Sequence, residues 1–108
     1  MIHELRIYHC APGRLPALND SFQHITLKFW EKYGIKPVAF WTTAVGPSNQ
    51  TLTYLLEWES LAERETKWDA FIGDPQWQAK RAESEAQAII VERIENQILV
   101  PTAYSPLR

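Results

Sequence analysis

Three side chains near the start of the chain could together bind an oxygen-bearing ligand. Glu4, Arg6 and Tyr8 alternate along residues 2–10, so a β-strand there would turn all three to one face. In a cavity they would supply an acid, a guanidinium that holds an anion, and a phenolic donor. Alternatively, the Glu–Arg pair would tie strands or subunits together, because buried charges are normally paired.

A group of large aromatic side chains could wall a pocket for a flat, apolar ligand. Aromatic rings give a large contact area, while Tyr O–H and Trp N–H groups orient the bound molecule. The alternative is that the same rings pack the core between helices and sheet and cover part of a dimer interface. The residues concerned are Trp41, Tyr54, Trp58, Trp68 and Trp77.

The histidines supply one candidate for proton transfer. His24 lies beside the apolar stripe of a predicted helix and would be the general base if a pocket adjoins that helix, and otherwise a surface residue. His3 and His9 share a strand face but lie roughly 20 Å apart, too far to share one metal ion. Cys10 is expected to be an unreactive, semi-buried thiol. We therefore expect no metal site and no cofactor.

Hydrophobic patterning predicts strands over residues 2–10, 37–45, 51–58 and 89–100, and two helical regions between them. The first helix covers residues 14–33, and Gly34 suits its left-handed C-terminal cap. Its apolar stripe recurs every three or four residues and consists of Leu15, Leu18, Phe22, Ile25, Phe29 and Tyr33.

The second helical region should consist of two helices. Ser60 and Glu63 form a capping box at its start, and Gly73-Asp74-Pro75 breaks it before a shorter helix that runs to about residue 86. Its charged segments, ERETK and KRAESE, are expected to be solvated faces with pairs between residues i and i+4.

The element order β-α-β-β-α-β is that of the ferredoxin-like fold, in the α+β class. It predicts a single domain over residues 1–108: one four-stranded antiparallel sheet with both helical regions on one face. An antiparallel sheet with one wet face should alternate cleanly, yet these strands carry apolar residues on both faces. We therefore expect a two-fold homodimer whose sheets meet face to face or form a shared barrel.

Five stretches, in order, resemble one family. The chain opens with MIHELRIYHCAPGRL, a strand and a Pro-Gly turn, and continues with the hairpin FWTTAVGPSNQ. The second helical region contains SLAERE and DPQWQ, and the chain closes with ENQILVPTAYSPL. Together they resemble the NIPSNAP domain over essentially the whole chain.

The resemblance implies a member of the dimeric α+β barrel superfamily, whose bacterial NIPSNAP members mostly have no assigned reaction. Related barrels include cofactor-independent monooxygenases, small isomerases and haem-degrading proteins. Family members often carry His where this chain has Tyr54, and Tyr where this chain has Trp58. Because this chain lacks that His, the resemblance does not imply a His-based mechanism at that place.

Composition narrows the classes of partner. The net charge is −2 with interspersed charges, so a basic surface for nucleic acid is not expected. No apolar run approaches the roughly 20 residues of a membrane span, and the first residues do not resemble a secretory signal. With a single cysteine and no such signal, a cytoplasmic protein is expected.

Two functions remain open. In the first, a dimeric barrel binds, and could transform, an apolar or aromatic small molecule by a cofactor-independent reaction such as oxygen insertion or isomerisation. Arg6 would hold a carboxylate or enolate, Tyr8 or Tyr54 would donate a hydrogen bond, and His24 would move a proton. In the second, the protein is a non-catalytic dimeric interaction module whose interior is filled by its own side chains.

Overall fold

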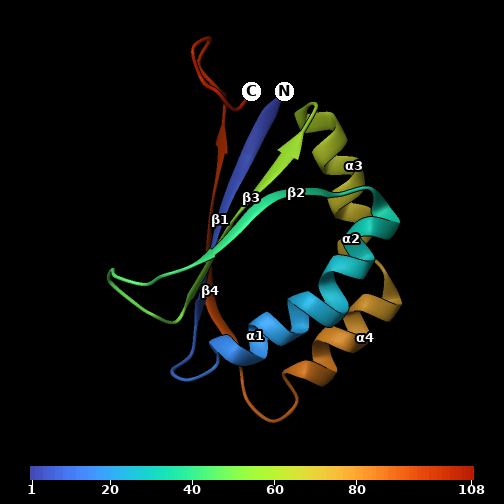
Figure 1. Cartoon of the computed structure of the whole chain (residues 1–108). Helices are drawn as coiled ribbons and strands as arrows, with labels where there is room; N and C mark the ends of the chain where they lie inside the picture. Colours follow the sequence, from blue (N-terminus) through green and yellow to red (C-terminus); the bar gives the residue numbers. More distant parts are fainter.

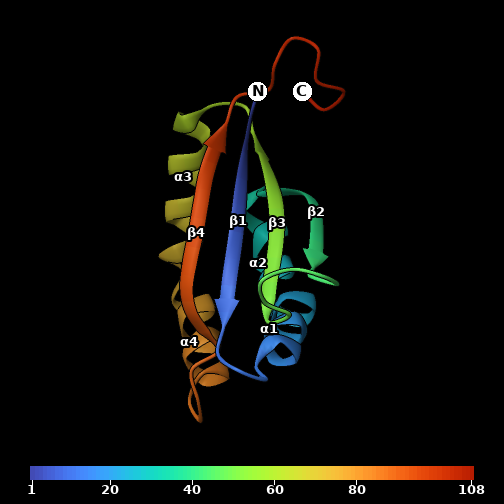
Figure 2. The same ribbon diagram turned by 90° about the vertical axis from the view of Figure 1, so that its left-hand side faces the viewer.

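A computed structural model describes all residues from Met1 to Arg108. Its single sheet contains four strands in the order β2-β3-β1-β4, and every neighbouring pair is antiparallel. All helices lie on one side of this sheet, and the opposite face is open (Figures 1 and 2). The ferredoxin-like α+β fold is thereby confirmed. The strands are β1 (Ile2–Cys10), β2 (Lys36–Thr42), β3 (Thr51–Trp58) and β4 (Val91–Leu99).

The helices form one layer against the sheet. The first helical region is a continuous run of α1, a π-helical turn η1 and α2, and the second is broken into α3 and α4 (Figure 1). Their bounds are α1 Leu15–Ser21, η1 Phe22–Thr26, α2 Leu27–Tyr33, α3 Leu61–Ile72 and α4 Pro75–Ser84.

The helix ends follow the local signals in the sequence. Gly34 has φ +72° and ends α2 in the left-handed conformation that glycine adopts without steric cost. Ser60 Oγ accepts a hydrogen bond from the backbone N–H of Glu63 at 3.1 Å, which caps α3. The Asp74 carboxylate accepts hydrogen bonds from the first backbone N–H groups of α4. The predicted capping residues and the break are therefore confirmed.

The π-helical turn changes which face of the first helix is buried. The predicted apolar stripe holds up to Phe22, but beyond it Thr26 and Trp30 are buried, whereas Ile25 and Phe29 are buried only in part. A π-helical turn contains more residues than an α-helical turn, so it rotates the following residues about the helix axis. As a result Trp30, at 1% exposure, becomes one of the most buried side chains.

Two strands are shorter than predicted. Residues 43–45 leave β2 because the hairpin turn begins at Thr43, whose Oγ1 lies 2.7 Å from Oγ1 of Thr51. Residues 89 and 90 precede β4, and Val100 follows it, directly before Pro101. The pairing of β2 with β3 is irregular between Pro37 and Ala39, at the place where proline lacks the N–H that a ladder requires.

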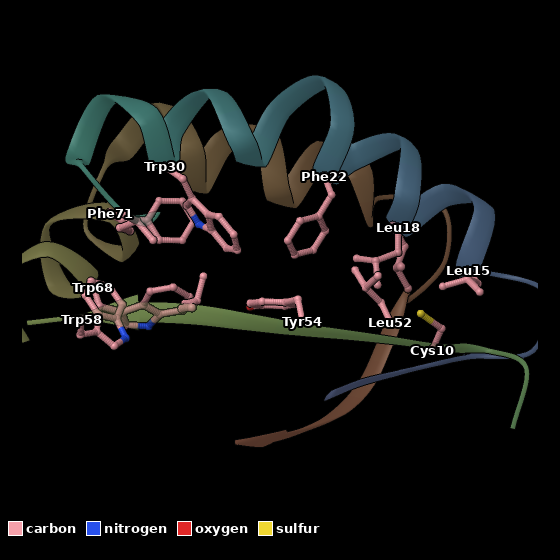
Figure 3. Close-up of a cluster of buried hydrophobic side chains, with 13 residues drawn as sticks. Cys10, Leu15, Leu18, Phe22, Trp30, Leu52, Tyr54, Trp58, Trp68 and Phe71 are labelled. Atoms are coloured by element: carbon pink, nitrogen blue, oxygen red, sulfur yellow. The ribbon is translucent and has the colours of Figure 1, made fainter. Parts of the chain in front are cut away.

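The hydrophobic core lies between the sheet and the helices. Trp30, Phe22 and Leu18 point from the first helical region toward Tyr54 and Leu52 on β3 (Figure 3). Many of the rings meet edge to face, such as Phe22 against Trp30 at 5.5 Å between centroids. This packing fixes the first helix over β3 and leaves β4 less covered, since nearly all of its residues are exposed.

The sheet face without helices, called the open face below, has an apolar centre. It carries alternate residues of each strand, because successive side chains of a strand point to opposite faces. Trp41 on β2 is 50% exposed there. Leu5, Ile7, Ala39 and Leu55 occupy neighbouring positions of the same face. In addition, no helix combines the length and the apolar character that a membrane crossing requires.

Candidate functional site

A cleft of about 480 Å³ lies between the helix-covered face of β1 and β4 and the two helical regions. Arg6 and Tyr8 from β1 lie at its base, which is called the floor below. Arg81, Glu85 and neighbouring residues of β4 line it as well. The aromatic lining consists of Tyr8, Phe22, Trp30, Trp68, Phe71 and Trp77.

Each wall of the cleft is positioned by a local irregularity of the chain. The π-helical turn η1 presents Phe22, Ile25 and Thr26 on one wall. On the other wall, the break between α3 and α4 brings Phe71 and Trp77 together, with ring centroids 4.3 Å apart. A helix of uniform pitch would present neither wall in this way.

Asp74 connects the two walls. One of its carboxylate oxygens accepts hydrogen bonds from Tyr33 Oη at 2.5 Å and from Lys32 Nζ at 3.0 Å, both at the end of α2. Its other oxygen caps α4 through the backbone N–H groups of Gln76 and Trp77. These bonds hold the pKa of Asp74 well below its usual range, with the Tyr33 bond contributing most. The carboxylate is therefore ionised at neutral pH.

Glu4 lies beneath the cleft and is completely buried. Arg64 Nε and Nη2 donate to its two oxygens at 2.7 and 3.1 Å, and Arg6 Nη1 donates at 2.9 Å. Asn96 Nδ2 at 3.0 Å and Trp58 Nε1 at 3.1 Å complete the set. Burial alone would raise the pKa of Glu4, but the bonds from Arg64, Asn96 and Arg6 outweigh it and lower the pKa to about 2.

Arg6 joins this buried carboxylate to the cleft. Its Nε donates to Tyr54 Oη at 2.8 Å, and its Nη2 donates a longer bond to Tyr8 Oη at 3.4 Å. The guanidinium also lies 4.6 Å from the ring centroid of Trp68, a cation–π arrangement. Arg6 is therefore held between a carboxylate, two phenols and an indole face.

Tyr54 and Tyr8 are linked through their hydroxyl groups. The two oxygens lie 2.9 Å apart, and Tyr54 donates to Tyr8. Burial raises the pKa of Tyr54 well above its usual range, so this phenol keeps its proton. Glu4, Arg6, Tyr54 and Tyr8 together form a continuous polar network that ends at the cleft.

Most of the residues that the sequence nominated lie in or beside this network. Arg6, Tyr8, Trp68 and Trp77 line the cleft. The remaining three support it from below: Glu4 as the common acceptor, Tyr54 between Arg6 and Tyr8, and Trp58 as a donor to Glu4. The charges of Glu4 and Arg6 are paired, as the structural interpretation expected, and of the three residues Arg6 and Tyr8 line the cleft.

Two nominated residues lie elsewhere. His24 has a side chain that is 61% exposed, and its Nδ1 lies 3.1 Å from Oδ1 of Asp20 one helical turn earlier. It points away from the cleft because the π-helical turn directs Phe22 and Thr26 inward instead. Trp41 lies on the open face, since its neighbour Phe40 is the one that packs against the core. Neither lines the cleft, so the site described above excludes both.

Several residues of the site were not nominated from the sequence. Arg64 belongs to the segment expected to be solvated, and the expected pair of Glu63 with Lys67 does form, at 3.3 Å. Arg64 itself turns inward to Glu4. Arg64 lies four residues before the buried Trp68, so both are on the same face of the helix, and this spacing could have indicated that Arg64 turns inward. Thr26 and Trp30 lie in the cleft because of the π-helical turn, for which the sequence gives no local signal.

Cys10 is buried, and burial raises the pKa of its thiol. A thiol in that state is mostly protonated at neutral pH and is a poor nucleophile. This agrees with the unreactive role expected from the sequence.

The chain has close structural relatives. The NIPSNAP family model matches residues 3–106. An uncharacterized NIPSNAP domain protein from Burkholderia xenovorans is 25% identical, with a TM-score of 0.84 over 98% of this chain and 99% of that chain. A NIPSNAP family protein from Agrobacterium tumefaciens is 25% identical, with a TM-score of 0.87 over 99% of this chain and 98% of that chain.

A more distant structure shares the fold alone. A putative antibiotic biosynthesis monooxygenase from Nitrosomonas europaea is 9% identical, with a TM-score of 0.63 over 96% of this chain and all of that chain. No curated protein matches this chain. The family model, which spans nearly all of the sequence, and the agreement of fold with solved members lead to one assignment: the chain belongs to the NIPSNAP family.

Proposed function

We propose that this NIPSNAP protein binds a small molecule with a flat, apolar body in the cleft between its sheet and its helices. The observation that carries the proposal is the cleft itself, which has aromatic walls and a floor formed by Arg6 and Tyr8. Its volume of about 480 Å³ falls within the range of roughly 300–1,000 Å³ that is typical of ligand pockets.

The proposal concerns binding and does not extend to a reaction. His24, the base nominated from the sequence, lies outside the cleft. Of the two glutamates that line the cleft, Glu92 is exposed, and Glu85 already accepts a hydrogen bond from the backbone N–H of Ile90 at 3.1 Å. By contrast, the aromatic walls need no further partner to hold a flat molecule. The aromatic walls of the cleft therefore support binding of a small molecule without a reaction.

Thermal unfolding in the presence of flat aromatic compounds tests this proposal. A ligand at one hundred times its dissociation constant should stabilise the protein by about 2.7 kcal/mol, so the Tm should rise with ligand concentration. The variant Ile94→Trp would fill the mouth of the cleft, where Ile94 is 48% exposed, and should abolish the rise. Val38→Trp, at a similarly exposed strand position outside the cleft, should preserve it. If no flat compound raises the Tm of the unaltered protein, the proposal fails.

A second proposal concerns assembly: we infer that two copies associate through their open faces. The half-exposed Trp41 on β2, Leu55 on β3, and Leu5 and Ile7 on β1 form an apolar surface that a lone chain would leave in water. The same face on two copies related by a two-fold axis is self-complementary. Membership of the NIPSNAP family, whose sequence pattern implies the dimeric α+β barrel superfamily, supports this arrangement.

A further inference from the structure

We infer that the ligand of the cleft presents an anionic oxygen, as in a carboxylate, an enolate or a phenolate. The phenolic O–H of Tyr8 donates a hydrogen bond to that oxygen. This inference rests on the proposed function, because it specifies the ligand of the same cleft. It follows from the direction of each hydrogen bond in the network beneath the cleft and from the charge of that network.

The direction of the network is set at Arg6. A guanidinium has only donors, so the 2.8 Å contact between Arg6 Nε and Tyr54 Oη is a bond that Tyr54 accepts. Tyr54 is completely buried and has one proton to donate. The Tyr54 hydroxyl donates a hydrogen bond to the Tyr8 oxygen, and the two oxygens lie 2.9 Å apart.

Tyr8 therefore has a proton without a partner in the protein. Its oxygen accepts one bond from Tyr54 and a longer one from Arg6 Nη2, and these occupy its two lone pairs. Neither partner is free to accept a proton in return. Because Tyr8 lines the cleft, its O–H is directed into that space. A ligand atom that meets it must be an acceptor.

The charge of the network favours an anion. Arg6 and Arg64 both contact Glu4, the one carboxylate that they share, so the buried group carries a net charge of one positive unit. The cleft lining outside the floor contributes two arginines and two glutamates, whose formal charges cancel. Arg6 also has five N–H groups, of which three are used in the network. Its remaining donors can add to the one from Tyr8.

A wall residue adds a further donor. Trp30 lines the cleft and is 1% exposed, and its Nε1–H has no acceptor in the protein. A buried N–H without a partner is costly, so a ligand or a water molecule that accepts from it would be favoured. Tyr8 thus has an unpaired donor at the floor of the cleft, and Trp30 has one that is buried behind its wall. This pattern matches an acceptor-rich ligand and disfavours an ammonium.

Four probes with the same ring system separate ring binding from recognition of the anion. They are 2-naphthoate, 2-naphthol, naphthalene and 2-naphthylmethylammonium, titrated calorimetrically against the full chain near neutral pH. A hydrogen bond to a charged group contributes about 1.5–3 kcal/mol, so naphthoate should bind at least about tenfold more tightly than naphthalene. The ammonium should bind most weakly because it meets positive charge and donors.

The variant Tyr8→Phe tests the role of the phenol. It should weaken naphthoate binding by about tenfold or more and leave naphthalene binding within about threefold. Tyr104→Phe is the matched control, because it removes a phenol that is 87% exposed and lies outside the cleft, and it should leave the affinity for naphthoate unchanged. The Tm of each variant identifies a loss of folding.

The outcomes distinguish the proposed binding of a flat molecule from the inference that this molecule carries an anionic oxygen. If naphthalene and naphthoate bind equally, or if Tyr8→Phe weakens both by the same factor, the inference about the anion is overturned while the proposed function stands. If none of the four probes binds to the unaltered protein, both are overturned. Tighter binding of naphthoate that is lost only in Tyr8→Phe supports both.

Discussion

Arg64 on α3 contacts both oxygens of Glu4 on β1, with hydrogen bonds of 2.7 and 3.1 Å between residues 60 positions apart in sequence. Because β1 is an inner strand of the sheet, this pair fastens the second helical region to the centre of the fold. It also helps to explain how this carboxylate can be fully buried, because both of its oxygens accept hydrogen bonds from a guanidinium. Trp58 donates a further bond to one oxygen, and Asn96 donates one to the other.

The variant Glu4→Gln should lower the free energy of unfolding by about 3–5 kcal/mol, because it leaves Arg6 and Arg64 without a countercharge in a buried place. Urea denaturation measures the change. Glu65→Gln, at an exposed position of the same helix as Arg64, should change stability by no more than about 0.5 kcal/mol. Equal stability of the two variants would show that the buried pair contributes nothing.

The stability difference between the unaltered protein and Glu4→Gln should depend on pH. The pKa of Glu4 is about 2 in the folded chain against an ordinary 4.5, so its contribution is fully present above pH 4.5 and is lost as the pH falls toward 2. The shift corresponds to about 3 kcal/mol. Denaturation curves of both proteins across this window should converge at low pH. A constant gap would contradict the assignment.

Asp74→Ala should lower the Tm by roughly 5 °C or more, because the change removes the cap of α4 and the bonds from Lys32 and Tyr33 together. Asp74→Asn keeps an acceptor for the cap and should lose less. Differential scanning fluorimetry gives the ranking, with the exposed Asp69→Ala as the control. If Asn were as damaging as Ala, the cap would not be the important contact.

The variant Trp41→Lys should weaken self-association, because it places a charge at the apolar centre of the open face. Thr42→Lys adds the same charge to the same strand but on the opposite face, since Thr42 pairs with Leu52, and should leave association intact. Sedimentation velocity over a range of concentrations measures both. A monomeric unaltered protein, or equal effects of the two variants, would refute association through this face.

Much of the fold follows from local patterns. Alternation along residues 2–10 correctly placed Glu4, Arg6 and Tyr8 on one face, because strand geometry fixes the direction of each side chain. Ser60 and Asp74 marked helix starts, since their side chains act on backbone N–H groups within three residues. These features depend on neighbours in the sequence, which the sequence displays directly.

The rest of the site depends on contacts between distant segments. Helical periodicity favoured Ile25 and Phe29 as inner residues, but the π-helical turn buries Thr26 and Trp30. A charge-rich helix predicts solvated side chains, yet the field of Glu4 draws Arg64 inward. Trp41 is as apolar as its buried counterparts, so its type does not tell which sheet face it occupies.

The distribution of indole rings gives this protein two separate optical signals. Trp30, Trp68 and Trp77 line the cleft, so a bound molecule with an absorbing ring would quench their emission. Trp41, half in water on the far side of the sheet, emits at longer wavelength until another surface covers it. Quenching should therefore follow ligand concentration, while a blue shift should follow protein concentration. Intrinsic tryptophan fluorescence can thus distinguish ligand binding in the cleft from self-association through the open face without any added label.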